Sequence, residues 1–189
     1  MAQRENQRVV ISKRLLKEGL LRLLETEKLE KVTVTDLCRE SGINRATFYR
    51  HYVCPRDVLV ELEQDMIHGA EKMLKKPTSH QEALHYLAVI CTFLYERRDL
   101  VCTLIRCKTD EELVQILREY NQRAWELRDE FKQAEQMDLD STRLVSTFLY
   151  SGGYYMIRQW LTEDIRKSPM EMAQLIYKMI FRQEPPEKL

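Results

Sequence analysis

The sequence is poor in the residues that interrupt helices. It contains only five glycines and five prolines, whereas Leu, Glu, Lys, Arg and Met are plentiful. Glycine and proline in a helix interior cost about 1 and about 3 kcal/mol relative to alanine, and the plentiful residues have high helix propensity. The composition therefore predicts an all-α protein, and the apolar periodicity along the chain divides into about nine helices.

Long apolar runs are also missing. No run approaches the ~18 residues that a membrane-spanning helix needs, and the opening MAQRENQRVV lacks the apolar core of a secretory signal peptide. The five cysteines form no C-x-x-C pair, which favours reduced thiols; a redox role for Cys102 or Cys107 is the minor alternative. We expect a cytoplasmic protein that makes no membrane contact.

The motifs of common enzyme classes are absent. The four histidines form no H-E-x-x-H zinc motif, and the sequence has no G-x-S-x-G turn and no glycine-rich phosphate loop. Acidic residues alternate with Lys and Arg at helical spacing, as they do on solvated helix faces. We therefore expect no catalytic residue, no bound metal and no cofactor.

The charges are balanced overall but unevenly distributed. The chain has 30 Lys and Arg and 30 Asp and Glu, a balance that by itself argues against a nucleic-acid partner. Residues 1–56, however, hold twelve basic and seven acidic residues, a net +5, which leaves −5 for the remainder. A basic head on an acidic body is typical of a DNA-reading domain joined to a domain with another task.

Residues 32–59 have the pattern of a helix-turn-helix. Thr33 is suited to cap a short helix, which Gly42 ends in the left-handed conformation. Asn44 can then cap a second helix from Arg45 to about residue 51, anchored in the core by Phe48. A plain helical hairpin is the alternative interpretation. The second helix argues against it because most of its residues donate hydrogen bonds suited to phosphates or base edges.

The same stretch resembles the signature of TetR-type transcriptional regulators. The matching residues are Thr33-Val34, Leu37, Ser41-Gly42-Ile43-Asn44, Thr47-Phe48-Tyr49-Arg50-His51-Tyr52 and Asp57-Val58-Leu59. The chain departs from the family at Lys28, where a glycine is usual, and at Pro55, where a phosphate-binding lysine is usual; Arg56 is the candidate to replace that lysine. The resemblance implies a TetR-like fold. It places a three-helix DNA-binding head in residues 1–54 and a larger helical domain for effector binding and dimerisation in residues 55–189.

The resemblance also implies how DNA would be read. Two heads would insert residues 45–51 into successive major grooves of a double-stranded, near-palindromic operator, ~34–36 Å apart. Arg45 and Thr47, assisted by Asn44, are the candidates for base edges. The candidates for phosphates, which fix register rather than sequence, are Thr33, Thr35, Tyr49, His51 and Arg56.

The last two predicted helices carry more apolar surface than one chain can cover. One runs from residue 141 to about 161 and the other opens at Ser168-Pro169. We therefore expect a homodimer. The order Phe148-x3-Gly152-Gly153, Arg158-x-Trp160-Leu161 and Ser168-Pro169 resembles the dimer-forming half of one TetR subgroup, and the glycine pair indicates close helix approach. The predicted interface residues are Phe148, Gly152, Met156, Trp160, Met172, Ile176 and Met179.

A group of aromatic and polar residues is the candidate effector site in the second domain. Its members are Tyr86, Phe93, Tyr120, Arg123, Trp125, Tyr150 and Tyr154. Any one of them is more often an ordinary core or surface residue. Together their polar groups suit a mostly apolar cavity for a small aromatic or amphipathic molecule, and Arg123 would favour a carboxylate or phosphate on it.

The resulting functional prediction is a dimeric TetR-type repressor that an unknown small molecule releases from its operator. Two alternatives remain open. One is a TetR-like co-activator whose second domain docks a protein partner, and the other is a helical binding protein with a vestigial head. Intact Arg45, Thr47, Tyr49 and His51 argue against a vestigial head.

Overall fold

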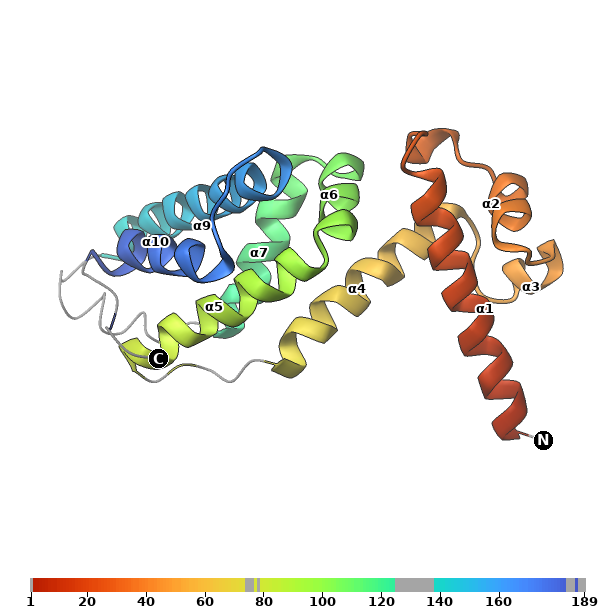
Figure 1. Ribbon diagram of the computed structural model, residues 1–189, viewed down its shortest axis with the longest axis horizontal. Coiled ribbons are helices and arrows are strands. Elements are labelled where there is room, and N and C mark those ends of the chain that lie inside the picture. The colour runs from red at the N-terminus through yellow and green to blue at the C-terminus, as the bar shows by residue number, and fades with distance from the viewer. Residues whose placement is uncertain (1, 74–76, 78, 125–137, 183–185, 187–189) are drawn as a thin grey trace. The chain divides into compact units, whose positions relative to one another are not determined.

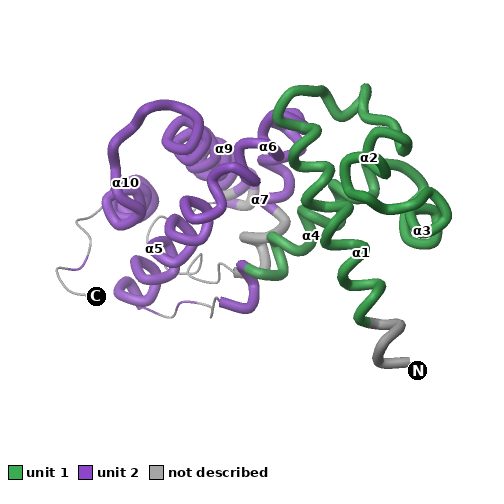
Figure 2. The backbone as a smooth tube through the Cα atoms, turned by 45° about the vertical axis from the view of Figure 1, so that its right-hand side comes forward, with its two compact units in different colours: residues 1–69 green, residues 70–189 purple. Residues whose placement is uncertain are grey.

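The computed structural model describes residues 2–73, 77, 79–124, 138–182 and 186, and these residues form nine α-helices and no strand (Figure 1). This confirms the predicted all-α class. The chain divides into two compact units, residues 1–69 and residues 70–189 (Figure 2). The expected domain boundary after residue 54 coincides with the start of a helix at Pro55, and it stays a prediction about the functional domains.

The first unit contains three complete helices and most of a fourth. They are α1 (Ala2–Leu23), a 3₁₀ turn η1 (Leu29–Lys31), α2 (Val34–Ser41), α3 (Arg45–Tyr49) and α4 (Pro55–Met73). The side chains of Leu16, Leu37 and Phe48 have no exposed surface, so α1 closes the head over α2 and α3 as the apolar periodicity predicts. Ile11 of α1 is apolar but 47% exposed.

The second unit is built around α5. Its helices are α5 (His80–Glu96), α6 (Arg98–Cys107), α7 (Asp110–Ala124), α9 (Leu139–Thr162) and α10 (Pro169–Phe181). Helix α10 packs along α5, and α9 packs against α6 and α7. Seven residues of α5 are buried, in keeping with its place at the centre of this unit.

Local hydrogen bonds set the ends of the last two helices. Arg98 donates to the backbone carbonyls of Leu161 and Glu163, where α9 ends and its last carbonyls lack helical partners. Ser168 then opens α10 as a capping box with Glu171, and Pro169 occupies the first turn, as the sequence predicts. Among the described residues, no helix combines the length and apolarity that crossing a bilayer requires.

Candidate nucleic-acid interface

Two short helices of the first unit form the helix-turn-helix. The hydroxyl of Thr33 accepts the backbone N–H of Asp36 and caps α2, and the side-chain oxygen of Asn44 accepts the N–H of Thr47 and caps α3. Between the two helices Gly42 has φ +68°, a left-handed conformation that glycine adopts without strain. The three predicted roles are therefore confirmed. Helix α3 is shorter than expected, because it ends at Tyr49.

Helix α3 buries one side chain and exposes most of the others. Phe48 lies in the core, while Arg45, Tyr49 and Arg50 are exposed and Thr47 is half-buried. Tyr49 is 59% exposed, with its ring edge-on to Phe48 at 5.4 Å between centroids. A helix anchored by one aromatic side chain and lined with donors on its open side has the form of a recognition helix.

The predicted contact residues lie at the start of α2, on α3, in the turns that precede and follow α3, and in the first turn of α4. Arg45 donates to the hydroxyl of Thr35 at 2.6 Å, so this pair is brought together across the two helices. Thr33 is less suited to contact a phosphate than predicted, because its hydroxyl already donates to the carboxylate of Asp36 at 2.5 Å. That hydrogen bond lowers the pKa of Asp36, and the resulting negative charge disfavours a phosphate beside Thr33.

The turn into α4 replaces the cap that Cys54 does not provide. The carboxylate of Asp57 accepts the backbone N–H groups of Val53 (2.7 Å) and Cys54 (3.1 Å). These two bonds lower the pKa of Asp57. Pro55 needs no N–H partner in this first turn, and Arg56 beside it is exposed. The substitution of proline for the usual lysine therefore leaves the start of the helix well satisfied.

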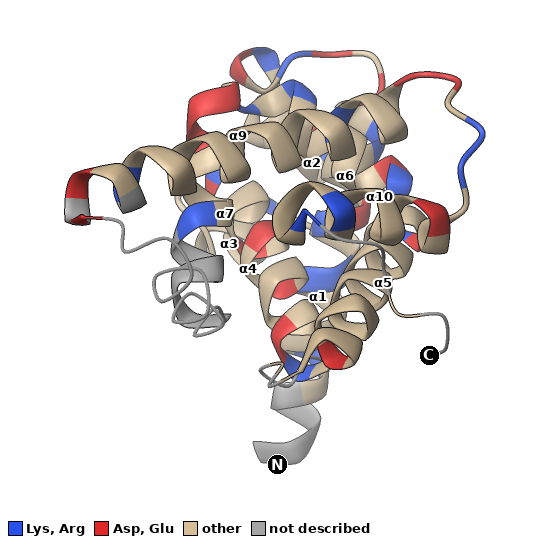
Figure 3. Ribbon diagram, turned by 90° about the vertical axis from the view of Figure 1, so that its left-hand side faces the viewer, with Lys and Arg blue, Asp and Glu red and all other residues tan. Residues whose placement is uncertain are grey.

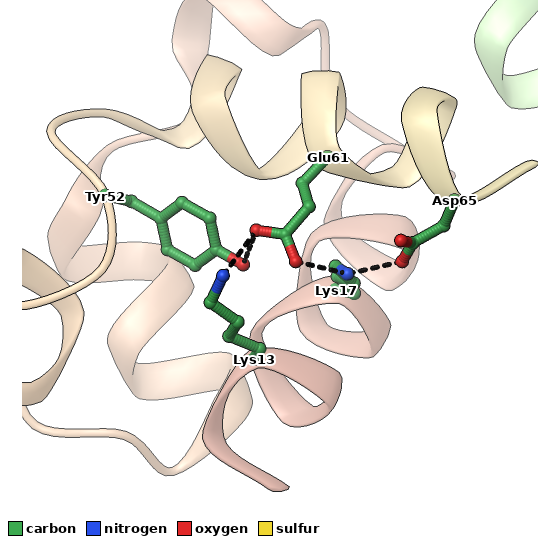
Figure 4. A network of polar contacts seen from close by, with 5 residues as sticks. All are labelled: Lys13, Lys17, Tyr52, Glu61 and Asp65. Atoms are coloured by element: carbon green, nitrogen blue, oxygen red, sulfur yellow. Dashed lines mark hydrogen bonds and ion pairs between the residues drawn. The ribbon is translucent and has the colours of Figure 1, made fainter. Parts of the chain in front are cut away.

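Behind α3, a polar network joins α1 to α4 (Figure 4). The carboxylate of Glu61 accepts from Lys13 (2.9 Å), Lys17 (2.8 Å) and the hydroxyl of Tyr52 (2.9 Å), and Lys17 also pairs with Asp65. Burial alone would raise the pKa of Glu61, but the hydrogen bonds from the two lysines and the tyrosine outweigh it and lower that pKa to about 2. Glu61 is therefore ionised at neutral pH.

His51 lies beside this network. Burial lowers the pKa of its imidazole, and the nearby charges of Lys13 and Arg50 lower it further, against an opposing effect of Glu61. At neutral pH the half-buried ring is therefore mostly uncharged. If His51 contacts a phosphate, it does so as a neutral N–H donor.

The candidate effector residues fall into two groups. Tyr86 and Phe93 on α5 are buried, Tyr150 on α9 is half-buried, and Tyr154 is buried with its hydroxyl donating to Asp110 at 2.5 Å. The side chains of Tyr120 and Arg123, and all of Trp125, lie outside the described residues. Burial and the bond to Asp110 raise the pKa of Tyr154, so this phenol already has a partner within the chain.

The residues predicted to form the dimer interface also fall into two groups, exposed and buried. Phe148 and Met179 are 76% and 56% exposed, Gly152 is exposed and Met156 half-buried. Three others were wrongly placed on a surface, because Trp160, Met172 and Ile176 are buried in the core of their own chain. The indole of Trp160 donates to the carbonyl of Lys167 and stacks on Tyr95.

The glycine pair makes no close approach inside the chain. A Cβ atom built on either Gly152 or Gly153 would meet nothing within 4 Å. The close helix approach predicted from this pair is therefore absent among the residues that the structure describes, and it stays a prediction for contact with a second copy.

Comparison with known proteins identifies the family. Residues 81–182, more than half of the chain, match the family model TetR_C_8, described as a transcriptional regulator C-terminal region. The chain belongs to the TetR family of transcriptional regulators. The resemblance first drawn on residues 33–59 is thus confirmed by the other end of the chain.

The curated relative that matches is distant in sequence. The chain is 20% identical over 171 residues to an uncharacterized HTH-type transcriptional regulator, YxbF, of Bacillus subtilis (strain 168). That alignment covers 87% of this chain and 43% of YxbF, so this chain spans less than half of the relative's length.

Solved structures share the fold. A TetR transcriptional regulator from Streptococcus agalactiae 2603V matches with a TM-score of 0.68 at 18% identity, over 95% of this chain and 99% of that one. The fatty acid degradation regulator FadR from Bacillus halodurans gives 0.63 at 10% identity over 89% and 94%. The dihydroxyacetone kinase operon activator DhaS gives 0.61 at 12% identity over 93% and 97%. These similar proteins are regulators rather than enzymes, and at such identities the match establishes the shared fold alone.

Sequence reasoning missed the polar network of this TetR-family head. Lys13 and Lys17 are four residues apart, as are Glu61 and Asp65, so each pair lies on one face of a helix. That complementary spacing was the available signal. It could not show that the two faces meet, because the partners are 44 to 48 residues apart in sequence.

Proposed function

We propose that this chain is a TetR-family repressor that binds a near-palindromic DNA operator as a homodimer and leaves it when a small molecule binds the second unit. The observation that carries the DNA-binding part is the capped helix α3, which buries only Phe48 and exposes Arg45 and Tyr49, with Arg50 exposed directly after it. Donors held in this way can reach base edges and phosphates in a major groove.

Within that proposal the residues have different roles. Arg45 is the principal base reader, because a guanidinium can donate two parallel bonds to guanine. Tyr49, His51 and Arg56 contact phosphates, and Thr35 orients Arg45. Thr33 acts mainly as the cap of α2, since its hydroxyl already bonds Asp36 in both directions.

The dimer proposal rests on the exposed apolar residues of the second unit. In α9 no charged residue occurs between Arg143 and Arg158, and Figure 3 shows the middle of this helix without acidic or basic residues. Leu144 and Phe148 are both more than 70% exposed there, four residues apart on one face. A second copy packed on this face would remove the apolar surface from water and bring a second head to the operator.

The test is selection of duplexes from a random library by the full chain, followed by titration at several salt concentrations. We expect a consensus with two inverted half-sites about one helical turn apart, and binding that weakens steeply with salt. Arg45→Ala should cost about 1–3 kcal/mol on that consensus and relax the preference at one base position. Enrichment of no sequence above the starting library would contradict the proposal.

A second candidate is an activator rather than a repressor. One structurally similar protein, DhaS, is named an operon activator, and an exposed apolar face on α9 could equally dock a different protein. A reporter gene placed behind the selected duplex separates the two. Repression requires lower expression when the chain is present, and activation requires higher expression. A thermal-shift screen of small metabolites, with release of the duplex as second readout, tests the effector.

A further inference from the structure

The segment that follows α3 is tied firmly to that helix. Tyr52 comes three residues after the end of α3, and its backbone N–H donates to the carbonyl of Phe48 at 3.0 Å. Its ring is buried and lies 5.8 Å from the ring of Phe48 between centroids. A change in the position of the Tyr52 side chain would therefore change the position of the recognition helix.

Helix α3 cannot hold its own orientation. It has only five residues, and a helix this short is not stable without tertiary support. Its support consists of the Asn44 cap at the start, the buried Phe48 in the middle and the buried Tyr52 just after the end. Of these three, only Tyr52 is connected by its polar group to another helix.

That connection is to Glu61, which lies between two oppositely placed sets of donors (Figure 4). One carboxylate oxygen accepts from Tyr52 and Lys13, and the other accepts from Lys17. The ammonium of Lys13 also lies 5.5 Å from the centre of the Tyr52 ring. An exposed single ion pair contributes little, whereas a part-buried carboxylate shared by three donors holds all of them in one geometry.

We propose that Glu61 is a positioning residue for DNA recognition, which holds Tyr52 against α1 and α4 and thereby fixes the recognition helix in the orientation that fits the groove. The inference rests on the proposed DNA-binding function. It assigns no DNA contact to Lys13 or Lys17, because both ammonium groups are already used by the carboxylates of α4.

The direction in which Glu61→Gln changes the DNA affinity distinguishes a positioning role of Glu61 from a purely electrostatic one. Glu61→Gln removes a negative charge and leaves Lys13 without its carboxylate partner, while Lys17 keeps Asp65, so a purely electrostatic account predicts tighter DNA binding and a steeper salt dependence. Positioning predicts weaker binding although the head becomes more positive. Since no phosphate contact is removed, the slope of log K against log salt should stay as in the parent chain.

The experiment uses the full chain and the duplex that it selects from a random library. We expect Glu61→Gln and Tyr52→Phe each to weaken binding about tenfold, and the double variant to weaken it no further than the stronger single one, because both changes act on the same hydrogen bond: the first removes the charge of its acceptor and the second removes its donor. Amide hydrogen exchange in the free protein should become faster in residues 45–52. Glu18→Gln is the matched control, since Glu18 pairs with Arg14 at 3.9 Å on the exposed side of α1; it should change neither quantity.

Three results would overturn the proposal. They are tighter binding by Glu61→Gln, parent-like binding by both single variants, and a loss of affinity with no faster exchange in residues 45–52. If Glu61→Gln lowers the stability of the whole unit, Tyr52→Phe, which keeps the buried ring and all charges, decides the question alone. If the parent selects no duplex, the proposed function fails, while the hydrogen-exchange comparison still tests whether Glu61 holds the segment.

Discussion

At the crossing of α1 and α2, Gly19 leaves little room for a side chain. A Cβ atom at this position would lie 3.1 Å from the Cβ of Ser41 and 3.3 Å from its Cα and N atoms. The obstacle is mostly backbone of α2, which cannot rotate away as a flexible side chain would. The hydroxyl of Ser41 is in addition bonded to the carbonyl of Leu37 at 2.7 Å, which fixes this contact further.

We therefore predict that Gly19→Ala lowers the free energy of unfolding of the first unit by about 1–3 kcal/mol, the range for overpacking, despite the helix propensity of alanine. Urea unfolding followed by circular dichroism would measure the change. Gly152→Ala is the matched control, because nothing lies within 4 Å of a Cβ there. It should leave the stability of a single chain unchanged or raise it by up to ~1 kcal/mol. Equal changes in the free energy of unfolding at the two positions would mean that α2 can shift to accommodate the methyl group at position 19.

The contact between Arg45 and Thr35 leads to a second residue-scale prediction. Thr35→Val keeps the shape of the side chain but removes the acceptor that holds the guanidinium at 2.6 Å. We expect the discrimination between the preferred base and the other bases at the position read by Arg45 to fall about tenfold, or by ~1.4 kcal/mol. Thr35→Ser, which keeps the acceptor, should retain the preference. Selection of duplexes by the three proteins measures it. A uniform loss of affinity with an unchanged consensus would show that Thr35 serves only as a phosphate contact.

The residues that sequence reasoning placed correctly act through local contacts. Thr33, Gly42 and Asn44 each satisfy a backbone group within a few residues, or adopt a conformation that their own chemistry allows. Such roles are set by short spacing along the chain and can be inferred from one sequence. The contact between Gly19 and Ser41, like the network around Glu61, depends on how two distant helices cross. No local pattern encodes that crossing.

At the scale of helices, the contact between α1 and α4 should respond to acid. The pKa of Glu61 in the folded chain is about 2, below its usual value of 4.5, so the stabilisation that Glu61 provides is complete above about pH 4.5. It is lost as the pH falls from there towards 2, because the unfolded chain binds a proton at Glu61 over this range, whereas Glu61 in the folded chain stays ionised until the pH reaches about 2.

We predict that Glu61→Gln destabilises the first unit at pH 6 and that the difference from the parent shrinks steadily between pH 4.5 and pH 2.5. Thermal unfolding of both proteins across this range measures it, with Glu18→Gln as the exposed control. A difference that is the same at every pH would mean that the charge of Glu61 does not stabilise the contact.

In the second unit, the sequence could not show which apolar residues are covered by their own chain. The apolar stripes of α9 and α10 were correctly recognised, but periodicity cannot say whether an apolar side chain is covered by its own chain or by another. Trp160, Met172 and Ile176 are covered by their own chain, while Leu144 and Phe148 are not. This distinction requires the positions of α5, α6 and α7, which depend on contacts far apart along the chain.

At the scale of the whole molecule, the charge asymmetry depends on where α4 is assigned. Residues 1–56 carry a net +5, but Asp57, Glu61, Glu63 and Asp65 of α4 reduce this to +1 over residues 1–69. Two of these carboxylates neutralise Lys13 and Lys17 directly. The basic character available to DNA therefore belongs to Arg45 of α3, Arg50 just after it and Arg56 in the first turn of α4, because α2 holds one basic and two acidic residues. It does not belong to the head as a whole.

Association should depend on the exposed apolar face of α9. Phe148→Lys changes a side chain that is 76% exposed, so the fold of one chain should be unaffected, yet a lysine buried against a second copy would lose its hydration without a partner. We predict that sedimentation shows a dimer for the parent and a monomer for the variant, which should also lose the tight binding that two linked heads give to two half-sites.

Val10→Lys provides the matched control, because Val10 is an apolar residue of the first unit that is 61% exposed. It should leave the dimer intact. Ile176→Lys is unsuitable for this purpose, since Ile176 is buried in its own chain and a charge there would unfold the second unit before it could report on association. If Phe148→Lys remains dimeric at low concentration and Val10→Lys does not, the two copies meet through α1 of the head. The spacing of the two recognition helices would then be set within the first units themselves.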